Sequence, residues 1–195
     1  EFWNENADTL ARASERYGVP EEVIVSIIGV ETIYGRNTGH FNVAEALATL
    51  AFDYPPRSKF FRQELKHFLR LSREEARDPA EPIGSYAGAM GYGQFISSSF
   101  REYAVDFDGD GIKDIWNNKQ DAIGSVANYL VERGGWKRDA AIIQKVTPNN
   151  PRTTYIPNSA SNRFMPLLFT EGFDEYYIMK RGDTLSQIAL RNDIT

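Results

Sequence analysis

The stretch from Val23 to Gly39 constrains the fold more than any other part of this sequence. Its first half, VIVSIIGVE, is apolar on almost every side, which is typical of a helix that is buried on most of its faces. Pro20 suits the first helical turn, and Glu21 and Glu22 complement the positive end of the helix dipole. Gly35 suits the C-cap. The pattern therefore predicts a buried helix that organises the chain.

One carboxylate, Glu31, falls in the last turn of this helix. Dry surroundings and the negative end of the helix dipole both favour the protonated carboxyl and raise its pKa. A glutamic acid that stays neutral near pH 7 can act as a general acid. The alternative is a structural Glu paired with Arg36 or another cation, because such pairs also shift pKa values. Taken alone, the helix favours this structural role.

Most of the chain up to Gly135 has the apolar spacing of amphipathic helices. Asn42 and Glu45 have the spacing of a capping box, as do Ser99 and Glu102. Further helices are expected over residues 2–17, 43–53, 57–76, 99–105 and 121–132, separated by breaks at Gly18, Pro55-Pro56 and Gly134-Gly135. The sequence therefore predicts a mainly α fold.

The segment SYAGAMGYGQF, from Ser85 to Phe95, contains too many glycines for a stable helix interior. It lacks the Lys-Ser/Thr ending and the preceding strand of a phosphate-binding loop, and its glycines do not have the order of a dinucleotide fingerprint. Two interpretations remain open. The glycines allow either a tight contact between helices or a loop that lines a ligand site.

The segment DFDGDGIKDIWN begins with the pattern of an EF-hand calcium loop. Its first, third, fifth and seventh positions are candidate ligands, the last through a backbone carbonyl: Asp106, Asp108, Asp110 and Ile112. Asn117 stands where an EF-hand has its bidentate Glu, and Asp121 can supply that carboxylate through a longer loop. We expect a structural Ca²⁺ here, and the alternative is a solvated turn.

Composition narrows the classes of function. The net charge is −5 and there is no basic run, which argues against a nucleic-acid binder. The absence of cysteine rules out disulfides and thiol chemistry. His40 and His67 do not have the spacing of metal ligands, and no G-x-S-x-G elbow indicates a serine triad. No apolar run is long enough for a membrane span.

Four motifs, in this order, resemble the bacterial membrane-bound lytic transglycosylase B family (glycoside hydrolase family 103). They are GVETIYGRNTG, SYAGAMGYGQF, YAVDFDGDG and DAIGSVANYL. The resemblance implies a lysozyme-like helical fold that acts on peptidoglycan, and a sole catalytic acid/base at Glu31. It also implies substrate contacts at Ser85, Tyr86, Gln94, Tyr129 and Arg57, and calcium ligands at Asp106, Asp108, Asp110 and Asp121, with one extra residue before Asp121.

The end of the chain differs from that family. The tyrosine-rich segment that usually completes the sugar cleft is not found, and YYIMKRGDTLSQIALRNDIT is similar to the first half of a LysM repeat. We therefore expect three parts: a lysozyme-like core over 1–135 with its calcium loop at 106–121, a small loop- and β-rich extension over 136–175, and a partial LysM-like segment over 176–195.

The resemblance implies a lytic transglycosylase that works with one carboxylate, since Asp53 and Glu45 are expected to be solvated. A goose-type lysozyme-like hydrolase and a non-catalytic, calcium-stabilised wall-binding protein are the alternatives. We expect a monomer in the bacterial periplasm or cell envelope. Association with the outer membrane would come through a segment that precedes Glu1.

Overall fold

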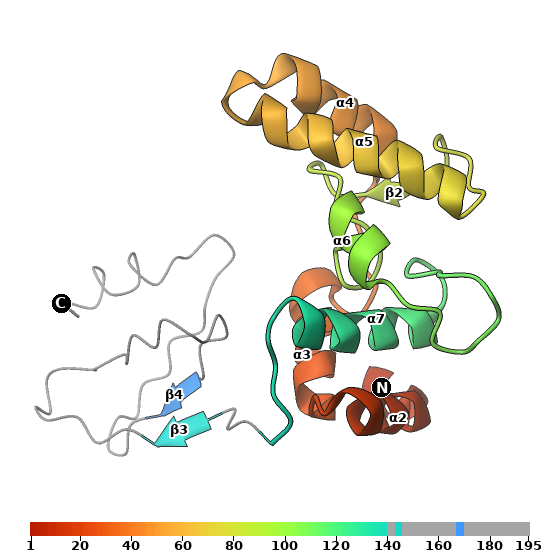
Figure 1. Ribbon diagram of the computed structural model, residues 1–195. Coiled ribbons are helices and arrows are strands. Elements are labelled where there is room, and N and C mark those ends of the chain that lie inside the picture. The colour runs from red at the N-terminus through yellow and green to blue at the C-terminus, as the bar shows by residue number, and fades with distance from the viewer. Residues whose placement is uncertain (140–142, 146–166, 170–195) are drawn as a thin grey trace, which may run out of the picture. The chain divides into compact units, whose positions relative to one another are not determined.

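The computed structural model describes residues 1–139, 143–145 and 167–169, and the chain divides into two units, Glu1–Asp139 and Ala140–Thr195. The first unit is mainly helical (Figure 1). Its helices are α1 (Phe2–Glu5), α2 (Ala7–Tyr17), α3 (Glu21–Thr32), α4 (Val43–Asp53), the 3₁₀ turn η1 (Pro55–Arg57), α5 (Ser58–Glu74), α6 (Ser97–Tyr103) and α7 (Lys119–Glu132). The prediction of a mainly α fold is confirmed for this part of the chain.

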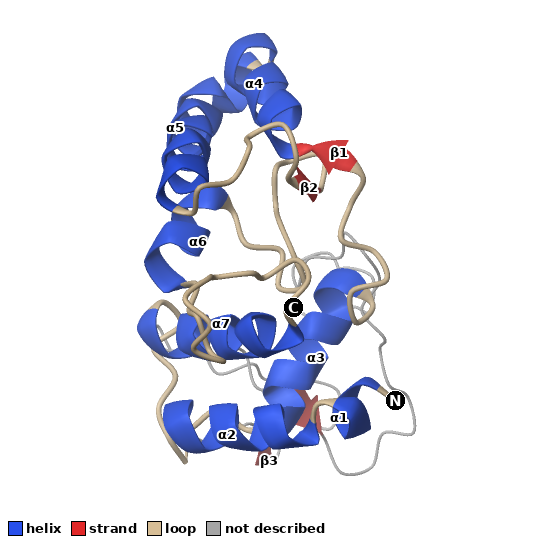
Figure 2. Ribbon diagram, turned by 90° about the vertical axis from the view of Figure 1, so that its right-hand side faces the viewer, coloured by secondary structure: helices blue, strands red, loops and turns tan. Residues whose placement is uncertain are grey.

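The helices of the first unit form two groups joined by α6. Helices α2, α3 and α7 pack against one another, α4 packs along α5 at the other end, and α6 contacts both α5 and α7 (Figures 1 and 2). The largest fully buried side chains come from both groups and include Leu10, Ile24, Ile28, Leu47, Phe68, Phe100 and Ile123. Burial of this apolar surface is the main force that holds the helices together.

A short antiparallel pair links the start of α4 to the glycine-rich segment. Strand β1 (Phe41–Asn42) pairs with β2 (Ile83–Gly84). The Asn42 side chain accepts a hydrogen bond from the Glu45 N–H at 3.0 Å, which confirms that Asn42 caps α4. The break at Pro55 is confirmed as well, since η1 separates α4 from α5.

Several predicted helix boundaries are wrong; those of α5 and α7 differ by one or two residues, and two others have a clear structural cause. The expected helix over 2–17 is interrupted at Asn6, whose side-chain amide donates to the Phe2 carbonyl at 2.7 Å, and such local bonds compete with helix propagation. Helix α6 begins at Ser97 rather than Ser99. The buried Glu64 of α5 accepts from the Ser98 N–H at 2.9 Å, so a residue distant in sequence supplies the cap.

Helix α3 is less buried than its sequence predicts. Val30 is 83% exposed and Ile33 is 53% exposed. The helix ends at Thr32, and Ile33, not Gly35, is the C-cap, because Ile33 and Tyr34 already adopt left-handed backbone conformations (φ 53° and 59°). Gly35 is needed for another reason: a Cβ there would lie 2.1 Å from the Tyr92 ring.

In the second unit, β3 (Ile143–Lys145) pairs in parallel with β4 (Leu167–Phe169), with Ile143 opposite Leu167. The LysM-like segment over 176–195 and most of the extension over 136–175 lie outside the described residues. Among the helices that the structure describes, none is both long and apolar enough to span a membrane.

Candidate active site

Glu31 lies in the last turn of α3, and no cation of the described residues neutralises it. Within the described residues it forms no ion pair or hydrogen bond, and Arg36 pairs instead with Glu1, with 3.8 Å between Nη2 and Oε2. The side chain is exposed overall, yet desolvation by neighbouring protein atoms raises the pKa of its carboxyl. The alternative pairing with Arg36 is therefore wrong, and the carboxyl is free to exchange a proton.

Thr32, the next residue, is fully buried and was missed by the sequence analysis. Its hydroxyl accepts a hydrogen bond from the Gly35 N–H at 2.9 Å. The same hydroxyl donates to the Tyr92 carbonyl at 3.0 Å and also lies 3.1 Å from the Ile28 carbonyl. These bonds tie the last turn of α3 to the glycine-rich loop. A threonine beside a candidate acid is the one signal that the sequence offers for this role.

The glycine-rich segment is a loop and not a helix, so the interpretation as a contact between two helices is wrong, but three of its glycines pack closely on neighbouring atoms. A role of this loop in lining a ligand site stays a prediction. A Cβ on Gly91 would lie 2.4 Å from the Ile115 carbonyl oxygen, and a Cβ on Gly88 would lie 2.5 Å from Leu47. A Cβ on Gly93 would lie 2.7 Å from Phe95. Paired backbone hydrogen bonds of 2.9 Å between Met90 and Phe95 close the loop.

Two polar side chains of this loop keep a hydrogen-bonding group available. The Ser85 hydroxyl accepts from the Ala87 and Ala89 N–H groups at 3.3 and 3.0 Å, which leaves its proton free to donate. The Gln94 amide nitrogen donates to the Thr38 and Gly91 carbonyls at 3.2 and 3.1 Å, so its oxygen remains an acceptor. Gln94 also has a left-handed backbone (φ 51°), a strained conformation that concentrates at functional sites.

The three remaining candidate substrate contacts lie in different settings. Tyr86 is 65% exposed and lies in the same loop as Ser85. Tyr129 of α7 makes edge-to-face contacts with Phe95 and Tyr103, with centroids 5.6 and 5.3 Å apart. Arg57 ends η1 and places its guanidinium over its neighbour Phe60, 4.5 Å from the ring centroid. Gln94 thus contacts Thr38 in the segment that follows Glu31, and Tyr129 contacts Phe95 beside Gln94, whereas the contacts of Arg57 stay at the start of α5.

The acidic loop between α6 and α7 gathers three of the predicted calcium ligands. One carboxylate oxygen from each of Asp106, Asp108 and Asp110 lies within 4.8 Å of the others. Asp106 accepts from the Gly111 and Gly109 N–H groups at 2.8 and 2.7 Å, and these bonds lower the pKa of its carboxyl, the Gly111 bond most. An ionised cluster of hard oxygens is the donor set that Ca²⁺ prefers.

Asp121 has a different environment from the other three aspartates. It is fully buried, and its two oxygens accept from the Phe107 and Asp114 N–H groups at 2.7 and 2.8 Å. Burial raises the pKa of its carboxyl, and the charges of Asp108 and Asp106 add to this rise. In this structure Asp121 holds both arms of the acidic loop against the start of α7. Its role as a metal ligand stays a prediction.

Comparison with known proteins extends the resemblance along the chain. Residues 1–173 match the model of the transglycosylase SLT domain family, and residues 177–195 match that of the LysM domain family. The membrane-bound lytic murein transglycosylase B of Escherichia coli K12 is 48% identical over 163 residues, which are 84% of this chain and 44% of that protein.

Three solved structures give the same answer. Soluble lytic transglycosylase SltB1 from Pseudomonas aeruginosa superposes with a TM-score of 0.70 at 61% identity, over 72% of this chain and 47% of that one. E. coli Slt35, solved in complex with calcium, superposes with a TM-score of 0.69 at 53% identity, over 72% of this chain and 44% of that one. P. aeruginosa SltB3, solved with NAG-anhNAM-pentapeptide, superposes with a TM-score of 0.67 at 40% identity, over 71% of this chain and 36% of that one.

The chain spans less than half the length of each of these relatives, so the comparisons concern a part of them. The family match nevertheless covers most of the present chain and includes the helix that carries Glu31, the glycine-rich loop and the acidic loop. With its helical arrangement and these identities, the chain belongs to the transglycosylase SLT domain family.

Proposed function

We propose that this chain carries the catalytic core of a peptidoglycan lytic transglycosylase. Its reaction is cleavage of the β-1,4 bond between N-acetylmuramic acid and N-acetylglucosamine, with formation of a 1,6-anhydromuramic acid end. Glu31 carries the proposal, because it is a carboxyl of raised pKa in the last turn of α3 that pairs with no cation in the described ranges. The relatives support it, since they are named lytic transglycosylases and SltB3 was solved with an anhydromuramyl ligand.

In the proposed mechanism Glu31 acts twice. The protonated carboxyl gives its proton to the glycosidic oxygen as the bond from that oxygen to the anomeric carbon breaks. The acetamido oxygen of the muramic acid stabilises the positive charge that develops on this carbon. The Glu31 carboxylate then takes the proton of the muramic 6-hydroxyl, whose oxygen bonds to the same carbon. Glu31 ends protonated, as it began, and no water is consumed.

The neighbouring loop has groups that suit the orientation of the substrate. Ser85 has a free hydroxyl proton for the Glu31 carboxylate or the acetamido oxygen, and Gln94 has a free amide oxygen for a sugar amide N–H. The rings of Tyr86 and Tyr129 offer apolar faces for stacking on sugars. Arg57 has a cation for a substrate carboxylate. Each of these roles is part of the proposal.

We also propose that the acidic loop holds a structural Ca²⁺. Asp106, Asp108 and Asp110 would hold the ion through carboxylates, and Ile112 through its carbonyl, with Asp121 as a further carboxylate. The ion would neutralise the mutual repulsion of these charges. The calcium complex of the relative Slt35 supports this assignment.

The proposed substrate places the protein in the bacterial cell envelope, since peptidoglycan lies there. The LysM match over 177–195 suggests a second contact with the wall polymer. Mass spectrometry of peptidoglycan digested by the chain tests the proposal. New anhydromuramyl ends are expected, whereas reducing ends heavier by one water would indicate the goose-type hydrolase. Binding without cleavage would indicate the non-catalytic protein.

A further inference from the structure

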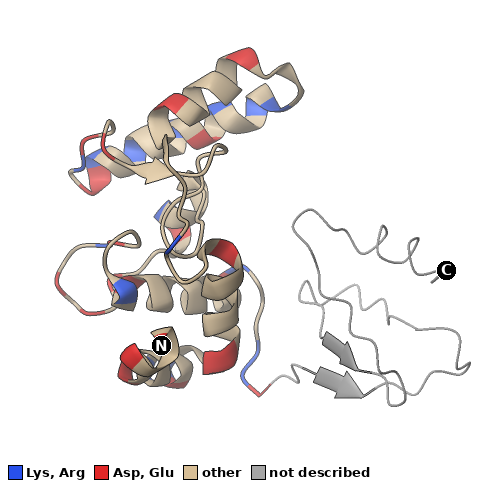
Figure 3. Cartoon of the chain, turned by 180° about the vertical axis from the view of Figure 1, so that it is seen from behind, with Lys and Arg blue, Asp and Glu red and all other residues tan. Residues whose placement is uncertain are grey.

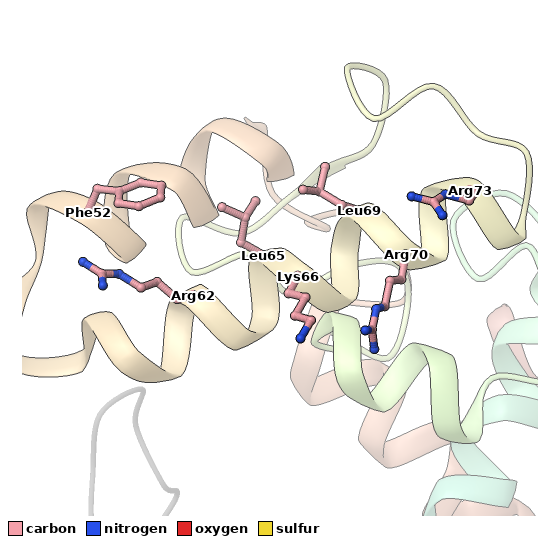
Figure 4. A pocket seen from close by; sticks show the side chains of 7 residues that line it. All are labelled: Phe52, Arg62, Leu65, Lys66, Leu69, Arg70 and Arg73. Carbon is pink, nitrogen blue, oxygen red and sulfur yellow. The ribbon is translucent and has the colours of Figure 1, made fainter.

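A shallow groove of about 340 Å³ runs between α4 and α5 and is lined by none of the candidate active-site residues (Figure 4). Its residues are of two kinds only, apolar and cationic. The apolar residues are Phe52, Leu65 and Leu69, and the cationic residues are Arg62, Lys66, Arg70 and Arg73. We call this set of seven side chains the basic groove.

The apolar part of the basic groove does not belong to the protein core. Helix α5 buries a different stripe, formed by Phe61, Glu64, Phe68 and Leu71. Leu69 is 51% exposed and Phe52 is 64% exposed. Both are therefore available to an apolar partner.

Within the part of the chain that the structure describes, the cations of the basic groove have little acidic compensation, and the one such interaction is the charge of Arg70, which helps to lower the pKa of Glu74. Within the described residues none of the four forms an ion pair, and Glu74, in the last turn of α5, is paired with Arg101 at 2.6 Å. Arg62 donates to the Ala51 carbonyl at 3.0 Å and stacks over Phe52. Four cations along one helix of a chain of net charge −5 are a local asymmetry, and Lys and Arg recur along α5 (Figure 3).

The chemistry of the basic groove selects among partners. All of its polar side chains donate hydrogen bonds and none accepts them. A glycan or a polypeptide carries its own donors, which would find no side-chain acceptor here. A phosphate diester has acceptors and negative charge alone. Exposed Phe and Leu beside Lys and Arg are also the composition of helices that lie at a lipid surface.

We propose that the basic groove docks the protein on an anionic phospholipid surface. The phosphate headgroups contact Arg62, Lys66, Arg70 and Arg73, and Phe52 and Leu69 enter the boundary between headgroups and acyl chains. From Arg62 to Arg73 the helix rises about 16 Å, which is enough to span more than one headgroup. This contact is independent of the proposed catalytic reaction.

Vesicle flotation tests the proposal with the 195-residue chain. We expect binding to vesicles of phosphatidylcholine with phosphatidylglycerol, and little binding to phosphatidylcholine alone. Each basic residue near such a surface contributes about 1 kcal/mol, or about a fivefold change in partitioning. The double variant Lys66→Gln/Arg70→Gln should therefore bind about 25-fold more weakly, and added salt should weaken the wild type. Leu69→Ser should also reduce binding.

The matched control is Arg133→Gln/Lys137→Gln, which removes two exposed cations outside the basic groove. This control should bind much more tightly than the groove variant, and both variants should keep the wild-type melting temperature and cleavage activity. Equal loss in the two double variants would overturn the proposal, since it would reveal non-specific attraction. Absence of flotation at low salt would overturn it too. So would a groove variant that floats normally but loses affinity for purified peptidoglycan or an acidic polypeptide.

Discussion

Replacing Thr32 by Val tests whether the bonds beside Glu31 hold the candidate site together. The two side chains have nearly the same shape, so the substitution removes the hydroxyl and leaves the packing almost unchanged. The Gly35 N–H loses its acceptor, and the Tyr92 carbonyl loses its donor. An unsatisfied group of this kind costs about 1–3 kcal/mol. Because both groups are only partly buried, we expect about 1–3 kcal/mol in total.

Thr32→Val should slow catalysis even under conditions in which the loss of folding stability leaves the variant folded. The Thr32 hydroxyl connects the turn after Glu31 to the loop that carries Gln94, and a misplacement of about 1 Å in a catalytic group can cost about 100-fold in rate. We expect the free energy of unfolding to fall as stated, and kcat for peptidoglycan cleavage to fall at least about tenfold at a temperature where the variant is folded. Denaturant unfolding and release of soluble muropeptides measure the two quantities.

Thr32→Ser is the control, because it keeps the hydroxyl and removes one methyl group. It should lose about 0.5–1.5 kcal/mol through the small cavity and should keep most of its activity. If Thr32→Val were as stable and as active as the wild type, the hydroxyl would have no positioning role, and the reasoning would be refuted.

Three further predictions concern Glu31 and the acidic loop. Glu31→Gln should lower activity by about 10²–10⁴-fold or more. The raised pKa of Glu31 means that its contribution to stability is complete below the ordinary pKa and is lost as pH rises through the raised pKa. The free energy of unfolding of the variant should therefore equal that of the wild type at low pH and exceed it by up to about 0.5 kcal/mol at pH 7. Calcium at 100 times its Kd should stabilise the fold by about 2.7 kcal/mol, an effect that EDTA reverses and Asp108→Asn weakens, and an unchanged melting temperature would disprove the site. Gly124→Ala should destabilise by about 1–3 kcal/mol, because its Cβ would lie 2.5 Å from Phe107; calorimetry showing no loss would mean that Phe107 moves freely.

The features that the sequence predicted well are those encoded within a few residues. The Asn42 cap, the break at Pro55 and the gathering of Asp106, Asp108 and Asp110 follow from local spacing, and the structure contains all three. The position of Glu31 in the last turn of an apolar helix is likewise a local feature, and its role as the acid stays a prediction that rests on the family resemblance. Such signals need no knowledge of distant contacts.

The features that were missed depend on residues far apart in the chain. Glu64 caps α6 across 34 positions, and Thr32 reaches Tyr92 across 60. The sequence also does not predict that Val30 and Leu69 are exposed, because hydrophobicity predicts an apolar face but not whether another element covers it. The family resemblance therefore gave the candidate acid, and neither it nor local spacing gave the bonds that position the turn beside it.

Cleavage in heavy-oxygen water tests the central claim most directly. If Glu31 directs the muramic 6-hydroxyl to the anomeric carbon, every new muramyl end is an anhydro end and carries no heavy oxygen from the solvent. Reducing ends that contain the label would show that water is the nucleophile, and the proposed double use of Glu31 would be contradicted.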